Sequence, residues 1–285
     1  MNTAERQNWD YFDVGTKDGN PLPILMGHRG VHGLCAAIAF GKAIEENSEA
    51  AFQAAKDLGL THIEADASAI KKKVIFEHGA DDEKEREENG RPTRSKLRTM
   101  EWAHVQREHP GSMLVEDALD KGTFPGMRWN IDLKDEFTVE GVVNAIQRTN
   151  AYNRVCLASF RRRNVDEAVR LLGGPNVLCT SGGPALGVAA KIGGLVASRA
   201  FENTDAACVQ WPFDQKVPIL GTTVHATEAM VRRANKYGLP VHFWVLNEEG
   251  QMVRALNWGA LGIISDRPDI GINVFKQRGF WSLAA

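Results

Sequence analysis

The sequence predicts an α/β protein and, within that class, a (β/α)8 (TIM) barrel in a single domain with loop insertions at the carboxyl ends of its strands. Three observations predict it. Short apolar runs alternate with helix-like runs along the chain, and polar residues repeatedly follow the apolar runs. The 285 residues also suit a fold that typically needs about 250. A hydrophobic content of 43% supplies one large core.

The expected strands are short runs rich in apolar and β-branched residues. They are 23–27, 61–66, 73–77, 128–133, 154–159, 176–180, 207–211, 240–246 and 261–265. An eight-stranded barrel uses only eight of these runs. We therefore expect one of them to lie outside the barrel, either 176–180 or 207–211.

Helices are expected between these strands. The run 47–58 has an apolar stripe at helical spacing, and Gly59 ends the helix. The stripe consists of Ala50, Ala51, Ala54, Ala55 and Leu58. The other expected helices are 99–108, 138–149, 163–172, 226–237 and 248–257. We expect a single domain over 1–285, with the barrel itself over 24–271.

Two segments have the character of insertions. The segment 31–45 is apolar and is expected either to cover the functional site or to form a buried loop or short core helix. The segment 79–98 carries a mixed run of charges from Asp81 to Glu88. Such a run predicts a solvated face or a mobile loop.

Charge and composition exclude several classes of protein. A net charge of −2 argues against nucleic acid as a partner. The sequence has no apolar run long enough for a membrane span and no signal-peptide region at its beginning. Its four cysteines are widely spaced, which predicts buried thiols and a cytoplasmic location. The composition leaves the oligomeric state open.

Three acids form the predicted metal site. Glu64 and Asp66 close one expected strand, and residues two apart in a strand point the same way. Asp132 and Lys134 repeat this spacing on another strand. An acid pair at a strand end is by itself more often surface chemistry. Three carboxylates from two strands, however, make an oxygen-only site suited to Mg²⁺ or Ca²⁺.

Two histidines near these acids follow expected strands, His28 and His78. Imidazole can give or accept a proton near neutral pH, so this pair suits general acid and base catalysis. Arg29 and Lys134 supply positive charge for a phosphate. The combination predicts an enzyme that acts on a phosphate ester, although the residues do not assign which histidine is the acid.

These residues resemble the glycerophosphodiester phosphodiesterase family over most of the chain. The resemblance rests on segments that occur in the family's order. They are His28–Arg29–Gly30, Glu46–Asn47–Ser48, Ile63 through Asp66, Val74 through His78, Ile131 through Lys134, Ser159–Phe160, Phe243 through Asn247 and Gly262 through Pro268.

The resemblance implies a metal-dependent hydrolase that splits a glycerophosphodiester, a small molecule, into an alcohol and a phosphomonoester. It implies His28 and His78 as the acid–base pair and one divalent cation, Mg²⁺ or Ca²⁺. The other implied roles are metal binding by Glu64, Asp66 and Asp132, phosphate binding by Arg29 and Lys134, orientation of these groups by Glu46, and lining of the pocket by Trp244.

The sequence departs from the family pattern at Gly79, where the family has aspartate, at 70–73, where it has a Thr-x-Asp-Gly hairpin, and at Asp132, where it has glutamate. The segment between His28 and Glu46 is also longer than usual. A bulkier alcohol is therefore an alternative substrate group.

Three alternatives to glycerophosphodiester hydrolysis stay open at this point. The first is a sugar phosphodiester of the agrocinopine (opine) type, because Trp129, Trp211 and Trp244 offer aromatic faces that suit sugars. The second is a barrel that binds phosphodiesters without catalysis. The third is a lyase-like reaction that forms a cyclic phosphate from a neighbouring hydroxyl.

Overall fold

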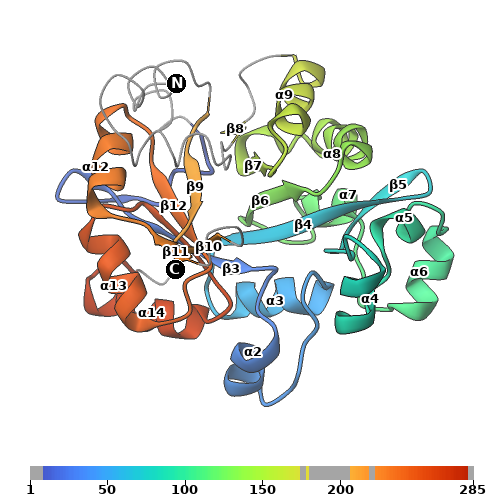
Figure 1. Ribbon diagram of the computed structural model, residues 1–285, viewed down its shortest axis with the longest axis horizontal. Coiled ribbons are helices and arrows are strands. Elements are labelled where there is room, and N and C mark those ends of the chain that lie inside the picture. Colours follow the sequence, from blue (N-terminus) through green and yellow to red (C-terminus); the bar gives the residue numbers. More distant parts are fainter. Residues whose placement is uncertain (1–8, 174–177, 180–205, 218–221, 282–285) are drawn as a thin grey trace.

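The computed structural model describes residues 9–173, 178–179, 206–217 and 222–281. Its centre is one curled sheet of eight parallel strands surrounded by helices (Figure 1), the arrangement of a (β/α)8 barrel. In the order in which they pair, the strands are β8 (Leu178–Cys179), β7 (Val155–Ala158), β6 (Arg128–Leu133), β4 (His62–Ile70), β3 (Ile24–His28), β13 (Gly262–Ser265), β12 (Val241–Trp244) and β9 (Val209–Pro212).

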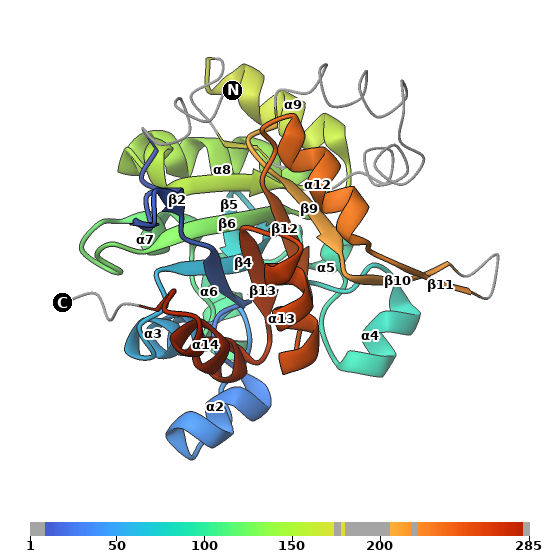
Figure 2. The same ribbon diagram turned by 90° about the vertical axis from the view of Figure 1, so that its left-hand side faces the viewer.

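Helices follow the strands and cover the outside of the sheet (Figures 1 and 2). The expected helices are present with small shifts at their ends: α3 (Glu49–Asp57), α6 (Trp102–Glu108), α8 (Glu136–Thr149), α9 (Arg162–Leu171), α12 (Glu228–Lys236) and α13 (Glu249–Asn257). Helices α7 (Val115–Leu119) and α14 (Pro268–Gln277) were not expected. The proline at the start of α14 and Asp269 in its first turn are start signals that the sequence does carry.

Successive strand residues point to opposite faces of the sheet, and the two faces have different surroundings. Outward side chains such as Ile63, Trp129 and Phe243 belong to the large apolar core between the sheet and the helices. Inward side chains such as Met26 and Ile264 form a second cluster, closed by Tyr11 from the segment before β3. The inward positions at the carboxyl ends of the strands are left for polar residues.

The strand outside the barrel is β5 (Lys73–Phe76), so the expectation that it would be 176–180 or 207–211 was wrong. β4 continues past the barrel to Ile70, turns at Lys72 with a left-handed φ of 62°, and pairs antiparallel with β5. β9 and the described part of 176–180, β8, both pair parallel with barrel strands. Apolar periodicity does not distinguish a barrel strand from the returning arm of a hairpin.

The two segments with insertion character contain short helices. Residues 31–45 include α2 (Gly33–Phe40), on which Cys35 is buried while Leu34 and Ile38 are exposed. Residues 79–98 include α4 (Glu83–Asn89) and α5 (Arg94–Leu97), so the charged run forms a largely exposed helix rather than a loop. In α4, Asp82 caps the first turn and Gly90 takes the left-handed position after the last one.

Two small antiparallel pairs complete the described structure. They are β1 (Thr16–Lys17) with β2 (Asn20–Pro21), and β10 (Asp214–Val217) with β11 (Thr222–His225). Among the described residues, no helix is both long and apolar enough to cross a membrane. Cys35, Cys156 and Cys208 are buried thiols, as expected, and the side chain of Cys179 lies outside the described residues.

Candidate active site

A tight turn after β3 positions the first two functional side chains. A Cβ atom at Gly27 would lie 2.6 Å from the Gly30 carbonyl oxygen, and one at Gly30 would lie 2.8 Å from Ala51 of α3. Gly30 also has a φ of 86°, which glycine adopts without steric cost. The two glycines therefore allow the chain to turn against α3 and to leave His28 and Arg29 at the barrel rim.

The strand register brings the three acids together. His28 pairs across the sheet with Glu64, and Asp66 pairs with Asp132 of β6. All four side chains therefore point inward on three neighbouring strands, and they line one cavity. The spacing of two residues places Glu64 and Asp66 on one face, but only the register places Asp132 next to Asp66.

Two cations lie against these acids. The Lys134 ammonium is 2.6 Å from Asp66 Oδ1 and 2.7 Å from Asp132 Oδ2, and Arg29 Nε is 2.7 Å from Asp66 Oδ2. Asn47 donates from Nδ2 to Asp66 Oδ2 at 3.1 Å and accepts from the Asp66 backbone N–H at 3.0 Å. The Asp66 carboxylate is therefore the centre of the charged cluster, with both of its oxygens engaged.

Glu46 lies behind Arg29. Its Oε1 is 2.6 Å from Arg29 Nη1 and 2.6 Å from Arg91 Nη1. Glu46 is absent from the described lining of the cavity. Glu46 therefore holds the Arg29 guanidinium from outside the cavity. The orienting role that the resemblance implied for Glu46 would need such a position.

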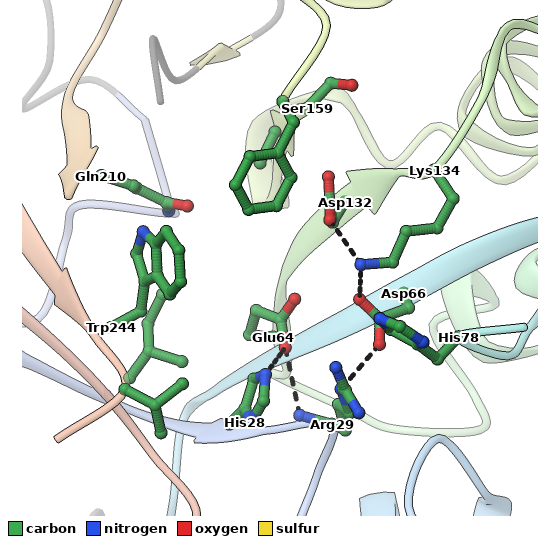
Figure 3. A pocket seen from close by; sticks show the side chains of 14 residues that line it. His28, Arg29, Glu64, Asp66, His78, Asp132, Lys134, Ser159, Gln210 and Trp244 are labelled. Carbon is green, nitrogen blue, oxygen red and sulfur yellow. Dashed lines mark hydrogen bonds and ion pairs between the residues drawn. The ribbon is translucent and has the colours of Figure 1, made fainter. Parts of the chain in front are cut away.

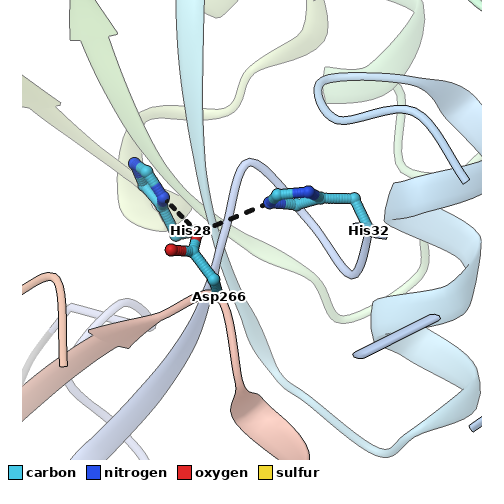
Figure 4. Close-up of side chains that lie close together, drawn as sticks. All are labelled: His28, His32 and Asp266. Carbon is cyan, nitrogen blue, oxygen red and sulfur yellow. Dashed lines mark hydrogen bonds and ion pairs between the residues drawn. The ribbon is translucent and has the colours of Figure 1, made fainter. Parts of the chain in front are cut away.

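His28 belongs to a second hydrogen-bonded group, shown in Figure 4. Its Nδ1 is 2.6 Å from Asp266 Oδ1, and Asn247 holds Asp266 by a side-chain bond of 2.9 Å and by accepting the Asp266 backbone N–H at 2.9 Å. His32 Nε2 is 3.5 Å from the same Asp266 oxygen. With Nδ1 bound to Asp266, the His28 Nε2 atom is the one that faces Glu64, at 3.8 Å.

His78 reaches the cavity by the β4–β5 hairpin rather than from the end of a barrel strand. The Glu77 backbone N–H donates to the Asp66 carbonyl oxygen at 2.9 Å, which brings the chain back to the barrel rim. His78 Nδ1 is buried and has no hydrogen-bond partner among the described residues, since the nearest carboxylate oxygen, on Glu85, is 3.9 Å away. Its imidazole therefore has a nitrogen available for another group.

Burial and neighbouring charges shift the pKa values of the two histidines, and of Glu64 and Asp66, in opposite directions. Burial and the Asp66 carboxylate raise the pKa of Glu64 to about 7. Against burial, the Lys134 and Arg29 charges hold the pKa of Asp66 well below its usual range. Burial lowers the pKa of His78 to about 4, whereas the pKa of His28 is raised because Glu64 and Asp266 outweigh its burial.

The cavity has a volume of about 330 Å³ and two unlike sides (Figure 3). Asp66, Asp132 and Lys134 lie on one side, and Trp244 and Gln210 lie on the other. The lining also includes Ala158, Phe160, Val245 and Ile264. This volume is near the lower end of the range for small-molecule sites.

Of the three tryptophans that were expected to offer faces to a substrate, Trp244 lines the cavity and the other two do not. Trp129 and Trp211 point outward from their strands and pack in the large core. Trp129, for example, stacks on Phe76 with ring centroids 5.4 Å apart. Successive residues of a strand alternate between the two faces of the sheet, so an aromatic residue faces the cavity only when it lies at an inward-pointing position.

The sequence reasoning did not single out Asp266, Asn247, Asn47 or Gln210 as site residues. Asp266 carried a usable signal, because it follows the expected strand 261–265 just as His28 and Lys134 follow theirs. Gln210 carried none, since a single amide in an apolar run does not reveal which face it occupies.

The acids of this cavity fit a divalent metal ion. Three buried carboxylates, Glu64, Asp66 and Asp132, lie beside two cations, Arg29 and Lys134, which leaves an excess of negative charge and an oxygen-only donor set. A second group, His28, His32 and Asp266, also has its ligand atoms within 4.8 Å of one another. There, the 2.6 Å between His28 Nδ1 and Asp266 Oδ1 is a hydrogen-bond distance, which two ligands separated by an ion would exceed.

A (β/α)8 barrel whose cavity joins two histidines, three carboxylates and two cations is suited to hydrolysis of phosphoric diesters. The sequence model of the Glycerophosphoryl diester phosphodiesterase family matches residues 28–270. The chain belongs to this family and is accordingly a phosphoric diester hydrolase. The resemblance stated from the motifs is thereby confirmed.

Individual relatives agree with this assignment. The chain is 32% identical over 266 residues to a Mycobacterium tuberculosis protein named "Probable glycerophosphodiester phosphodiesterase 2", covering 90% of this chain and 92% of the relative.

Solved structures confirm the predicted fold. A glycerophosphodiester phosphodiesterase from Parabacteroides distasonis superposes with a TM-score of 0.65 at 15% identity, covering 90% of this chain and 98% of the other. An Oleispira antarctica phosphodiesterase, solved with the product sn-glycerol-3-phosphate, superposes with a TM-score of 0.63 at 16% identity, covering 90% of this chain and 97% of the other.

Proposed function

We propose that this protein is a metal-dependent phosphodiesterase that hydrolyses a glycerophosphodiester-type substrate to an alcohol and a phosphomonoester. The observation that carries the proposal is the meeting of His28, His78, Arg29 and Lys134 in one small cavity. Binding a phosphodiester requires cations, but it does not require two histidines that line the cavity. The pair therefore favours catalysis over binding alone.

Glu64, Asp66 and Asp132 would hold one divalent cation, Mg²⁺ or Ca²⁺. When bound, such an ion supplies positive charge for a phosphoryl oxygen during the reaction. Lys134 bridges two of these acids in the structure, and it has three N–H donors, so one donor is left for a phosphate oxygen. Arg29 supplies the second positive charge on the same side.

His28 and His78 would move the two protons that the reaction requires. One imidazole takes a proton from the attacking hydroxyl or water, and the other gives a proton to the leaving alcohol. Asp266 keeps His28 Nδ1 occupied and Nε2 directed at the cavity. Glu46 orients Arg29 from behind, and Trp244 lines the side of the cavity where an alcohol group has room.

The test is turnover of purified protein that has been stripped of metal and then supplied with Mg²⁺, Ca²⁺ or Mn²⁺. We expect no cleavage of glycerophosphodiesters in EDTA and restored cleavage with at least one ion. His28→Ala and His78→Ala should each lower kcat by about 10²-fold or more. His225→Ala, at an exposed histidine of the β10–β11 pair, should keep the wild-type rate.

Full activity in EDTA would contradict the metal site, and an active, folded His28→Ala or His78→Ala protein would contradict the acid–base pair. Tight binding of diesters without turnover would favour a non-catalytic barrel. Phosphorus NMR of the products separates hydrolysis from cyclic-phosphate formation, because the two products differ in their phosphorus environment.

A further inference from the structure

The buried amide of Gln210 has no role in the chemistry described so far. Gln210 lies on β9 and is 5% exposed, and its Nε2 is buried without a hydrogen-bond partner among the described residues. Gln210 lies opposite His242 in the β9–β12 pairing, and its side chain is on the inward face of the sheet. It is one of the residues that line the cavity. Buried polar atoms are nearly always paired in folded proteins, so an unpaired amide that faces a cavity indicates a group that the cavity binds.

Gln210 lies on the apolar side of the cavity. Figure 3 shows it next to Trp244 and across the cavity from Arg29 and Lys134. A phosphate held by those two cations therefore directs one of its alcohol groups towards Gln210 and Trp244. Phe160 packs edge-on against Trp244 with ring centroids 5.6 Å apart, which leaves an aromatic wall on this side.

The chemistry of this side selects among alcohols. Among the described residues that line this side there is no carboxylate, because Glu64, Asp66 and Asp132 lie towards Arg29 and Lys134. A choline group would meet no counter-ion among the described residues there, although its quaternary ammonium could lie on the aromatic face of Trp244. It has no N–H or O–H group, however, so the buried Gln210 amide would stay unpaired. A hydroxyl both donates and accepts, so it can pair with Gln210 in either orientation of the amide, while the C–H face of a polyol or sugar lies on Trp244.

We propose that Gln210 is a specificity-determining residue that binds a hydroxyl of the substrate alcohol, and that the enzyme prefers phosphodiesters of uncharged polyols or sugars to those of choline. The proposal rests on the proposed function and names its substrate class. The cavity volume of about 330 Å³ is in keeping with one compact alcohol group and a phosphate.

The test compares wild type with Gln210→Met, which keeps the length of the side chain and removes both polar atoms. Binding of glycerophosphoglycerol and of glycerophosphocholine is measured by calorimetry in EDTA, where the measurement is independent of turnover. We expect wild type to bind the glycerol diester more tightly. Gln210→Met should lose about tenfold in affinity for it and change little towards the choline diester.

Two controls separate binding from a structural role. Asn130→Leu removes another buried amide of the inward face that has no partner in the described part of the chain. Asn130 is absent from the described cavity lining, so this variant should leave the ratio of the two affinities unchanged. The Tm of Gln210→Met should equal or exceed that of wild type, because the substitution removes an unpaired buried donor.

The proposal would be overturned if Gln210→Met lost equal affinity for both diesters, if wild type preferred the choline diester, or if wild type bound neither. A lowered Tm of Gln210→Met with an unchanged ratio of the two affinities would also overturn it. Selective binding that depends on Gln210, without cleavage when Mg²⁺ is added, would support this inference while contradicting the proposed function.

Discussion

Asp266 determines which nitrogen of His28 meets the cavity, because its carboxylate occupies Nδ1 at 2.6 Å. Against the effect of burial, hydrogen bonds from His28, His32 and Asn247 hold the pKa of Asp266 well below its usual range, which favours the ionised carboxylate. A neutral amide at this position could present the wrong hydrogen-bonding group to Nδ1 and change the tautomer.

Asp266→Asn should therefore lower kcat by about 10²-fold with a smaller change in KM, because proton transfer by His28 would be impaired while binding is kept. The measurement is steady-state kinetics across pH. Asp214→Asn is a matched control, since Asp214 also holds a histidine, His225, at 2.7 Å, but on the exposed β10–β11 pair. If both variants lost activity equally, the role assigned to Asp266 would be wrong.

Lys134 separates two carboxylates that would otherwise repel each other at close range. Its side chain is 10% exposed, and removal of one partner from a buried ion pair typically costs about 3–5 kcal/mol. Lys134→Met should lower the free energy of unfolding by an amount of this order in EDTA, measured by urea titration. Added Mg²⁺ should raise the Tm of the variant more than that of wild type, because the ion would replace the lost positive charge.

Lys71→Met is the control for this experiment, since Lys71 forms an exposed pair with Glu101. Exposed pairs contribute little to stability, so neither its stability nor its response to Mg²⁺ should differ from wild type. A Lys134→Met protein as stable as wild type in EDTA would show that the charged cluster does not depend on this residue.

The β4–β5 hairpin is the element that positions His78, and it packs against α8. A Cβ atom at Gly141 of α8 would lie 2.0 Å from Cγ2 of Val74 on β5. Val74 is buried and β-branched, so it has little freedom to move. The close approach of helix and hairpin therefore requires a glycine at this position.

Gly141→Ala should destabilise the protein by about 1–3 kcal/mol through overpacking, although an alanine normally favours a helix. Gly250→Ala in α13 is the matched control, because a Cβ there meets no atom within 4 Å, and it should stabilise by about 0.5–1 kcal/mol. Val74→Ala should relieve the clash, so urea titration of the double variant should show less than the sum of the two single losses. Strict additivity would contradict the packing argument.

The molecule has two different barrel ends, which Figure 2 shows from the side. At the amino ends of the strands, Tyr11 is fully buried and its carbonyl oxygen is 2.7 Å from Nε2 of His62. The segment before β3 thus closes one end with apolar side chains. The cavity with its charged residues occupies the other end.

Tyr11→Ala should lower the free energy of unfolding by about 3–5 kcal/mol, as expected for removal of a buried aromatic ring. Tyr11→Phe should lose far less, because the partners of its hydroxyl group are sulfur atoms, Met26 at 3.7 Å and Cys156, and sulfur is a weak hydrogen-bond acceptor. Thermal or urea unfolding measures both. A small loss for Tyr11→Ala would show that the segment around residue 11 does not close the barrel.

The sequence by itself determined the fold class and most of the charged side of the site. Alternating apolar and helical runs predict a parallel α/β barrel, and the spacing of Glu64 and Asp66 follows from the two-residue period of a strand, which is a local property. The position of His28 after a predicted strand likewise needed no tertiary information. These predictions hold because they depend on neighbours in the chain.

Only the tertiary structure decided which strand leaves the barrel, which tryptophan faces the cavity and which residues support the histidines. All three are consequences of strand register. β5 pairs back onto β4, and Trp244 and Gln210 point inward. The hydrogen bond between Asp266 and His28 joins residues that are 238 positions apart in the sequence. Register is set by packing between segments far apart in the chain, so no local pattern records it.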